Sequence, residues 1–383
     1  MEVEVPVGTV HPALLEPFRI RFLVEDEVVE DCEITFNAAH RGIERILEGL
    51  PIQNANMVTE RICGICSGIH LWNSCRVSEM ALDVRITPRA NWIRVLSAEL
   101  ERLHSHTLFF GHAFEVLGHE TFSYRSFALR EPIMTVLQAF TGNRVHYAVP
   151  IIGGVRPRCD LTEKTLKIVN RNFKGAKEKI TAYIERILRD PLIESRLEGT
   201  GILENKVAEK LHAVGPTGRA SGIQKDWRKD IPEYESFDFD MIVLEDGDNK
   251  TRVVSRALEV LESVKIIEQI LAGLPEGDLV VPWERKASGF KESYMEAPRG
   301  ELYHSLSLDE EGKVRHYKIR PPTTTTLGPV EEACVGDHLT DAILTIASCD
   351  PCLCCANRAI VVDADKKKER MLTYEQIKAR YKK

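Results

Sequence analysis

The sequence has no long unbroken hydrophobic run, no basic surplus and no low-complexity linker. Its densest apolar segment, residues 346–362, is too short and too broken to cross a bilayer. The first residues, MEVEVPVGTVHPALLEP, lack the basic start and apolar centre of a signal peptide. A net charge of −7 argues against non-specific nucleic-acid binding, which needs a clustered basic surface. These absences predict a soluble, cytoplasmic chain.

The ten cysteines are the unusual feature of an otherwise ordinary composition. A chain of 383 residues can bury a large core without disulfides, so metal ligands or buried thiols are favoured over a disulfide framework. Four cysteines stand singly in apolar surroundings, where the interpretation as small buried hydrophobes is favoured: Cys32, Cys75, Cys159 and Cys334. The other six lie in two short segments.

The hydrophobic pattern predicts a mainly helical (α+β) body with small β-hairpin additions. Alternating residues predict hairpins over 18–37 and 300–320. Helical spacing predicts helices over residues 38–50, from Pro88 to about Gly118, and over 132–141, 161–188 and 250–273. No composition break divides the chain, so residues 1–358 are expected to form a single domain.

Two Cys-x-x-Cys pairs, Cys63/Cys66 and Cys352/Cys355, lie near opposite ends of the chain. Four thiolates suit zinc, iron–sulfur or another soft-metal centre. Zinc ribbons place their pairs about 15–20 residues apart, whereas here the whole fold would have to assemble the site. A thioredoxin-type dithiol would need only one pair, beside a βαβ pattern that is absent. Cys349 also lies three residues before Cys352, so the second pair has two alternative registers.

The surroundings of the pairs carry a family resemblance. Residues 61–70 follow R-x-C-G-x-C-x-x-x-H, and residues 350–355 follow D-P-C-x-x-C. Together they resemble the two cysteine motifs of the nickel–iron hydrogenase large (catalytic) subunit. Further matching segments, in the same order, are HRGIE (40–44), EAPRGEL (296–302) and RPPTTTT (320–326).

Other segments, among them GNRVHYAVPIIGGVRPR and GPTGRASGI, resemble the quinone-site subunit of respiratory complex I. That subunit descends from the hydrogenase fold and has lost the metal cysteines. A chain with both sets of features resembles a membrane-associated, energy-converting hydrogenase. The resemblance spans residues 9–358 and implies the helical fold of the hydrogenase large subunit.

The resemblance implies a Ni-Fe(CN)2(CO) centre on four thiolates. Cys63 and Cys352 would be terminal nickel ligands, and Cys66 and Cys355 would bridge to the iron. Soft thiolate ligands suit this chemistry. The register Cys352/Cys355 is preferred because it alone follows Asp350-Pro351.

Five other residues take roles from the resemblance. Glu16 matches a glutamate that relays protons from a terminal cysteine, and Arg299 matches an arginine above the open metal site. His70 would bond near a bridging sulfur, and either Thr323 or Thr324 would bond an iron ligand. The alternatives are a surface glutamate, a structural histidine and a threonine-rich turn.

Glu44 matches a carboxylate that holds a structural magnesium (Mg) ion in many relatives. Those relatives complete the site with a histidine where this chain has Arg358. Glu44 is therefore expected either to bind magnesium or to pair with Arg358. The charged extension over 359–383 is either removed by a maturation protease after Arg358 or retained as a solvated helix.

The function implied is reversible H2 oxidation and proton reduction, coupled to ferredoxin-type electron transfer and ion translocation. The implied partners are an iron–sulfur small subunit, membrane ion-translocating subunits, a ferredoxin-type carrier and a maturation protease. They would hold the chain on the inner face of the membrane. Two alternatives are a complex-I-like or sulfur-reducing-type coupling subunit without hydrogenase activity, and a structural zinc protein.

Overall fold

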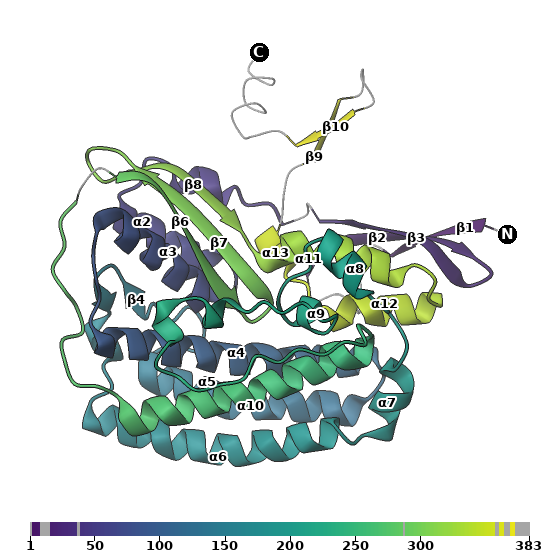
Figure 1. Cartoon of the computed structure of the whole chain (residues 1–383), viewed down its shortest axis with the longest axis horizontal. Helices are drawn as coiled ribbons and strands as arrows, with labels where there is room; N and C mark the ends of the chain where they lie inside the picture. Colours follow the sequence, from purple (N-terminus) through teal and green to yellow (C-terminus); the bar gives the residue numbers. More distant parts are fainter. Residues whose placement is uncertain are drawn as a thin grey trace.

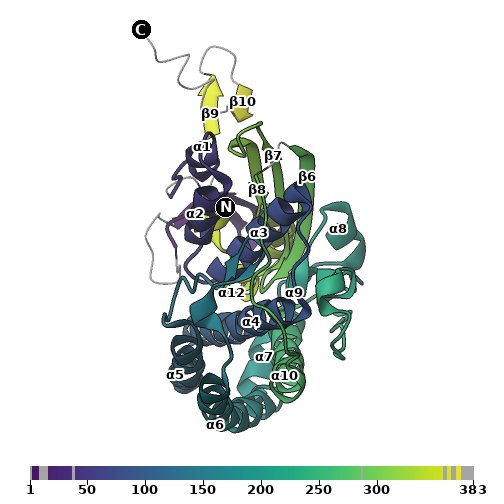
Figure 2. The same cartoon turned by 90° about the vertical axis from the view of Figure 1, so that its left-hand side faces the viewer.

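Four long helices pack side by side and form the base of the molecule (Figure 1). They are α4 (Pro88–Val116), α5 (Glu120–Thr141), α6 (Glu163–Ile187) and α10 (Asn249–Gly273). Figure 2 shows the same helices nearly end-on. Threonine or aspartate side chains accept backbone N–H groups at the starts of three of them, where the first turn lacks intrahelical partners: Thr87, Thr162 and Asp248.

The computed structural model describes residues 2–7, 16–36, 39–285, 288–356, 360–363 and 368–371. The shorter α-helices are α1 (Ile43–Leu47), α2 (Ile52–Thr59), α3 (Ser67–Leu82), α7 (Pro191–Leu197), α8 (Asn205–Lys210), α9 (Gly215–Arg219), α11 (Pro322–Cys334), α12 (Leu339–Ser348) and α13 (Leu353–Ala356). Short 3-10 helices are η1 (Glu60–Ile62), η2 (Pro157–Cys159), η3 (Trp227–Lys229) and η4 (Pro232–Tyr234).

The described strands form four small antiparallel sheets. Two sheets have three strands: β1 (Glu2–Val7), β2 (Arg19–Glu25) and β3 (Val28–Thr35) in one, and β6 (Ser288–Ala297), β7 (Gly300–Leu308) and β8 (Val314–Arg320) in the other. The other two pair β4 (Pro150–Ile151) with β5 (Gly154–Val155), and β9 (Ile360–Asp363) with β10 (Lys368–Met371). The predicted fold class, mainly helical with small β additions, is confirmed.

The sheets cover different parts of the helical body. The β6–β8 sheet packs on α3 above the helical base (Figures 1 and 2). The β1–β3 sheet lies to one side, where its inward residues form a separate apolar cluster with α11 and α12. The first cysteine pair precedes α3 and the second adjoins α13, so the cysteines lie where these layers meet.

The predicted elements differ from the observed ones in three places. Both hairpins are present, but each gains an additional strand, β1 and β6 respectively. The helix predicted over 132–141 begins earlier, at Glu120, because the helix continues through Pro132. Of the helix predicted over 38–50, the described residues form only the five-residue α1, which begins after a left-handed Gly42.

Among the described residues, no helix combines the length and apolar character needed to span a bilayer. Arg358 and most of the extension over 359–383 lie outside the described residues. The predictions of a cleavage after Arg358 and of a single domain over 1–358 stay predictions.

The buried body contains charge as well as apolar side chains. Arg94 on α4 donates two hydrogen bonds to Glu79 on α3, at 2.9 and 2.6 Å, and both side chains are almost fully buried. The guanidinium also bonds the carbonyls of Ile151 and Gly154. This pair fastens the β4–β5 hairpin and the cysteine-bearing α3 to the helical base.

Replacing Glu79 by glutamine should lower the free energy of unfolding by about 3–5 kcal/mol, because it leaves the Arg94 cation buried without its counter-charge. Chemical denaturation measures the loss. The control is Glu268→Gln, which removes an exposed pair with Lys177 between α10 and α6 and should change stability little. Equal stability of the Glu79 variant and the wild type would contradict the expectation.

Candidate metal centre

Four cysteine thiols converge in the interior of the protein. The sulfur atoms of Cys63, Cys66, Cys352 and Cys355 all lie within 4.8 Å of one another, and all four residues are buried. The Sγ atoms of Cys63 and Cys352 are 3.4 Å apart. Among the described residues this is the one cluster of three or more histidine, cysteine or acidic side chains close enough to hold a metal ion.

The cysteine pairs sit on short turns beside helix starts. Cys66 immediately precedes α3, and the Cys63 sulfur accepts the backbone N–H groups of Ile65 (3.3 Å) and Cys66 (3.2 Å). Asp350 adopts the left-handed conformation, with φ of 54°, before Pro351 and α13. These turns aim the two thiols of each pair to the same side, as a shared ligand site requires.

Arg41 fastens the two cysteine segments to each other. Its guanidinium donates to the carbonyls of Arg61 (2.7 Å) and Ile62 (2.6 Å), just before the first pair. It also donates to the carbonyl of Cys354 (3.1 Å), within the second pair. One side chain therefore spans segments about three hundred residues apart in sequence. The HRGIE motif indicated a matching segment, but its pattern gave no sign of this role.

The thiols are electrostatically coupled. Hydrogen bonds from the other three cysteines, led by Cys352, hold the pKa of Cys63 well below its ordinary value. Burial, together with the hydrogen bonds that it donates to its neighbours, raises the pKa of Cys355 well above its ordinary value. Without a cation the cluster thus favours one thiolate supported by its neighbours. Four thiolates together would need a metal ion to balance their charge.

The donor set fits a thiolate-bound metal. Metal–sulfur bonds of about 2.3 Å around one tetrahedral ion put the sulfurs about 3.8 Å apart. The observed cluster, within 4.8 Å, is close to that spacing. Cys349 and Cys354 do not belong to it: the Cys349 sulfur lies 3.9 Å from the Ser348 hydroxyl, and Cys354 is only half-buried.

Arg299 lies in the turn between β6 and β7, and its side chain is buried. It donates to the Asp350 carboxylate at 2.8 Å, to the Asp350 carbonyl at 2.7 Å and to the Ser105 hydroxyl at 3.3 Å. Burial alone would lower the pKa of this guanidinium, but Asp350 and then the thiols of the cluster raise it well above its ordinary value. Arg299 is therefore a permanent cation beside the thiols.

Two glycines allow the Arg299 turn to approach α9 closely. Gly215 has φ of +64°, and a Cβ there would lie 2.3 Å from the carbonyl oxygen of Arg299. Gly300 has φ of +124°, and its Cβ would lie 2.6 Å from the backbone nitrogen of Gly215. Side chains at either position would push the arginine-bearing turn away. The GPTGRASG segment thus supports the site through its backbone.

Glu16 lies at the second cysteine pair. Its carboxylate accepts the backbone N–H groups of Leu353 and Cys354, the latter at 2.9 Å. The Cys352 thiol lies 3.9 Å from the other carboxylate oxygen. A carboxylate at this distance can exchange a proton with the thiol directly or through one water molecule.

The two threonines have different surroundings. The Thr323 hydroxyl accepts the backbone N–H of Cys352 at 2.9 Å. The Thr324 hydroxyl oxygen is buried and has no hydrogen-bond partner among the described residues. Thr323 thus positions a cysteine, whereas Thr324 holds an unused donor.

Glu44 bonds to β8. Its carboxylate accepts the backbone N–H of Ile319 at 3.0 Å and pairs with Lys318 at 2.8 Å. Arg358, its other predicted partner, lies outside the described residues. The choice between magnesium and an arginine partner stays a prediction.

A second glutamate lies behind the first cysteine pair. Glu101 on α4 accepts the backbone N–H groups of Gly68 (2.6 Å) and Ile69 (3.0 Å) at the start of α3. Burial raises the pKa of this carboxyl group to about 8. Glu101 was missed from the sequence, as were Asp350 and Ser105 as partners of Arg299. Charged residues within a deeply apolar helix were the available signal for Glu101.

The mainly helical fold and the cluster of four buried thiols are those expected of a hydrogenase large subunit. The family described as nickel-dependent hydrogenase matches residues 41–116, and that described as the 49 Kd subunit of respiratory-chain NADH dehydrogenase matches residues 117–294 and 285–358. The chain belongs to the family that includes the large subunit of nickel-dependent hydrogenases and the 49 Kd subunit of respiratory-chain NADH dehydrogenase. The predicted resemblance to an energy-converting nickel–iron hydrogenase large subunit is confirmed.

Relatives of both kinds align over nearly the whole chain. The chain is 33% identical to the membrane-bound hydrogenase subunit alpha of Pyrococcus furiosus, over 95% of this chain and 90% of the relative. It is 30% identical to hydrogenase-4 component G of Escherichia coli, over 97% of this chain and 65% of the relative. It is also 30% identical to an NADH-quinone oxidoreductase subunit of Dehalococcoides mccartyi, over 90% of this chain and 95% of the relative.

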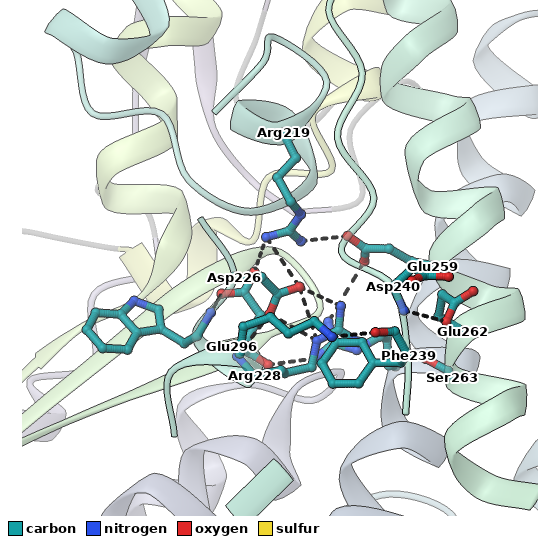
Figure 3. A network of polar contacts seen from close by, with 12 residues as sticks. Arg219, Asp226, Arg228, Phe239, Asp240, Glu259, Glu262, Ser263 and Glu296 are labelled. Atoms are coloured by element: carbon teal, nitrogen blue, oxygen red, sulfur yellow. Dashed lines mark hydrogen bonds and ion pairs between the residues drawn. The ribbon is translucent and has the colours of Figure 1, made fainter. Parts of the chain in front are cut away.

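A buried network of charges includes Glu296 on β6, the strand that leads to Arg299. Figure 3 shows Arg219 between carboxylates from different elements. It donates to Glu296 at 2.8 Å and to Glu259 at 2.6 Å, while Asp226 binds Arg228. Glu296 and Glu259 therefore share the guanidinium of Arg219. Burial, followed by the charge of Asp226, raises the pKa of Glu296 to about 7, although Arg219 opposes the shift.

Glu296 is also the network carboxylate that reaches a surface pocket. The pocket has a volume of about 540 Å³ and is lined by His212, Lys225, Trp227 and Glu301 as well as Glu296.

The raised pKa of Glu296 makes stability depend on pH. Below about pH 4.5 the folded and unfolded states both hold the proton, and the contribution of this carboxyl group to stability is fully present. Between about pH 4.5 and 7 the unfolded state releases the proton first, so the contribution is lost as pH rises. Between pH 4.5 and neutral pH, the free energy of unfolding of the wild type should therefore fall by about 3 kcal/mol more than that of Glu296→Gln, which has no proton to release. Chemical denaturation of both proteins across this pH range measures the difference. A pH-independent difference between the two proteins would contradict this assignment.

Proposed function

We propose that this chain is the catalytic subunit of an energy-converting nickel–iron hydrogenase. The observation that carries the proposal is the buried cluster of four thiols with a permanent cation, Arg299, and a carboxylate, Glu16, beside it. A closed structural zinc site would need the thiols alone. The additional charged groups, Arg299 and Glu16, support a site at which electrons and protons are transferred.

The four cysteines would bind the metals as thiolates, and each thiol gives up its proton on binding. When bound, a nickel–iron centre supplies the two-electron chemistry that interconverts H2 with two protons and two electrons. The protein holds the thiolates in a buried, water-poor cluster. Neighbouring thiols and the backbone N–H groups of Ile65 and Cys66 stabilise the charge on Cys63.

Glu16 would move protons to and from the Cys352 sulfur. Its carboxylate is held by two backbone N–H groups, so one oxygen stays close to the thiol without further ordering. Arg299, fixed by Asp350 and Ser105, would orient small ligands and exclude water on its side of the centre. The unpaired hydroxyl of Thr324 would donate a hydrogen bond to a ligand of the iron. The Thr323 hydroxyl instead accepts the backbone N–H of Cys352 and holds that residue in place.

The electrons need a partner. The clustered cysteines are committed to one site, so an iron–sulfur small subunit would carry electrons to a ferredoxin-type protein. Membrane ion-translocating subunits would complete the complex and hold this chain on the inner face of the membrane. Relatives named as subunits of membrane-bound hydrogenase and of NADH-quinone oxidoreductase support this assembly.

A coupling subunit without hydrogenase activity is the alternative, because relatives include NADH-quinone oxidoreductase subunits. Such a role needs a bistable element but no metal ligands. The convergence of four thiols argues for the catalytic proposal, and metal analysis distinguishes the two.

The complex, purified without air, should contain nickel, with iron in excess of nickel because the iron–sulfur partner adds its own, and should show infrared bands of cyanide and carbon monoxide ligands. Cys355→Ser should lose the nickel and the bands, because serine replaces a soft thiolate ligand. Cys354→Ser changes the neighbouring cysteine, which lies outside the cluster, and should retain them. Zinc, or no metal and no bands, in the wild type would overturn the catalytic proposal.

Glu16→Gln should keep the metals but lower H2 oxidation and proton reduction by about 100-fold or more, because glutamine accepts the same backbone N–H groups yet carries no proton for transfer. Hydrogen–deuterium exchange activity and nickel content are measured together. Glu30→Gln, at an exposed position on β3, serves as control. Full activity of the Glu16 variant would remove Glu16 from the proton path.

A further inference from the structure

Two histidines lie close to the first cysteine pair. His70 on α3 hydrogen-bonds His304 on β7 at 3.2 Å, and its bond near a bridging sulfur stays a prediction. His104 on α4 contacts the turn between the two cysteines, because its Nε2 lies 3.0 Å from the backbone carbonyl oxygen of Ile65. This contact attaches a buried helix to the backbone between two predicted metal ligands.

The Ile65 carbonyl belongs to the peptide group that also donates to a cysteine sulfur. The next backbone N–H, that of Cys66, donates to the Cys63 sulfur at 3.2 Å. The peptide is planar and trans, so its C=O and its N–H point in opposite directions. His104 therefore holds one end of a rigid unit whose other end donates to Cys63.

Arg130 on α5 holds the other edge of the His104 ring. Its Nη2 lies 3.3 Å from Nδ1 of His104, and the neighbouring Glu131 pairs with Arg144 instead. Nε of Arg130 is buried and has no hydrogen-bond partner among the described residues. A half-buried guanidinium with an unused donor gains little stability from its position. Its contact with His104 gives another reason for that position.

The chemistry of the two partners fixes the direction of both His104 bonds. A guanidinium only donates, and a carbonyl oxygen only accepts. Nδ1 must therefore accept from Arg130, and the ring proton must lie on Nε2 to reach Ile65. His104 carries one ring proton, because burial, followed by the charge of Arg130, lowers its pKa to about 3. Among the described residues, nothing else hydrogen-bonds either ring nitrogen.

Every donor in this series points toward the sulfur. The guanidinium donates to the imidazole, the imidazole donates to the carbonyl, and the N–H of the same peptide donates to Cys63. Linked hydrogen bonds in a low-dielectric interior strengthen one another. His104 has no exposed surface, so water does not compete for its bonds. The series thus holds the peptide and directs its positive end at the thiol.

We propose that His104 is a positioning residue for the metal centre: oriented by Arg130, it fixes the Ile65–Cys66 peptide so that the peptide N–H stays on the Cys63 sulfur. The inference deepens the proposed function and rests on it in one respect, that Cys63 is a metal ligand. Thr323 holds the backbone of Cys352 in a comparable way at the second pair. The hydrogen bonds of His104 belong to the protein itself and can be measured whichever metal is bound.

The ring protonation of His104 can be read by 15N nuclear magnetic resonance of the complex with labelled histidine, because protonated and unprotonated ring nitrogens have widely separated chemical shifts. The His104→Gln variant identifies the His104 signals by their loss. Nε2 should be protonated and Nδ1 unprotonated from about pH 5 to 8, since the pKa lies well below this range. A proton on Nδ1, in a neutral or a charged ring, would overturn the proposal.

The hold on the peptide is measured by amide hydrogen exchange, with mass spectrometry of the fragment that contains the first cysteine pair. His104→Phe keeps a buried ring but loses the donor, and exchange in this fragment should quicken about tenfold. His104→Gln keeps an N–H donor near the position of Nε2 and should restore most of the protection. Equal protection in the phenylalanine variant and the wild type would refute the role of His104.

Arg130→Met tests the orientation separately, since it leaves the bond from His104 to Ile65 in place. The Nδ1 signal should shift to that of a lone pair without a donor, and exchange should quicken by less than in His104→Phe. Arg125→Met removes an exposed arginine of the same helix, serves as the matched control and should change neither. An unchanged Nδ1 signal in Arg130→Met would overturn the part assigned to Arg130.

Melting temperatures show whether each variant is folded, and Arg130→Met keeps the test open if His104→Phe does not fold. Metal analysis of the same samples separates this inference from the proposed function. The expected exchange rates in a complex that holds zinc or no metal would sustain the role of His104 and overturn the hydrogenase. Nickel and cyanide bands with unchanged exchange rates would do the reverse.

Discussion

The structure depends on bringing two pairs of thiols from opposite ends of the chain into one buried cluster. Cys66 and Cys352 are separated by most of the fold, so no local turn can place them together. The closure is made by long-range contacts, chiefly Arg41 across both segments and Glu16 on the backbone after Cys352. The rest of the fold supplies the rigid surfaces that hold those contacts. A site assembled in this way exists only in the folded protein.

The fold also depends on buried arginine side chains that are paired with carbonyl and carboxylate groups. Guanidinium groups hold the elements together by binding carbonyls and carboxylates, and each is costly to bury alone. Arg94 joins α3 to α4, Arg219 joins α9 to α10 and β6, and Arg299 joins the β6–β7 turn to Asp350. These buried guanidinium groups thus fasten together elements that lie far apart in the sequence.

The sequence predicted those parts that periodicity and short motifs encode. The long helices follow from apolar spacing, and Cys63, Cys66, Cys352 and Cys355 follow from two spacing motifs. Strands β1 and β6 were missed, because Pro6 interrupts the alternating pattern of β1 and β6 is an edge strand with charged residues. The partners of Arg299 could not be predicted, because Asp350 and Ser105 lie far from it in the sequence and their residue types also serve ordinary core roles.

The carboxylate and the guanidinium beside the cysteine cluster are both fastened to the second cysteine segment. Glu16 accepts the backbone N–H groups of Leu353 and Cys354, and its other oxygen lies 3.9 Å from the Cys352 sulfur. Arg299 donates to the carboxylate and the carbonyl of Asp350, two residues before Cys352. A shift of this segment would therefore carry the thiols and both charged groups with it. The spacing between the thiols and their charged neighbours is thus set locally, whereas the meeting of the two cysteine pairs is set by the whole fold.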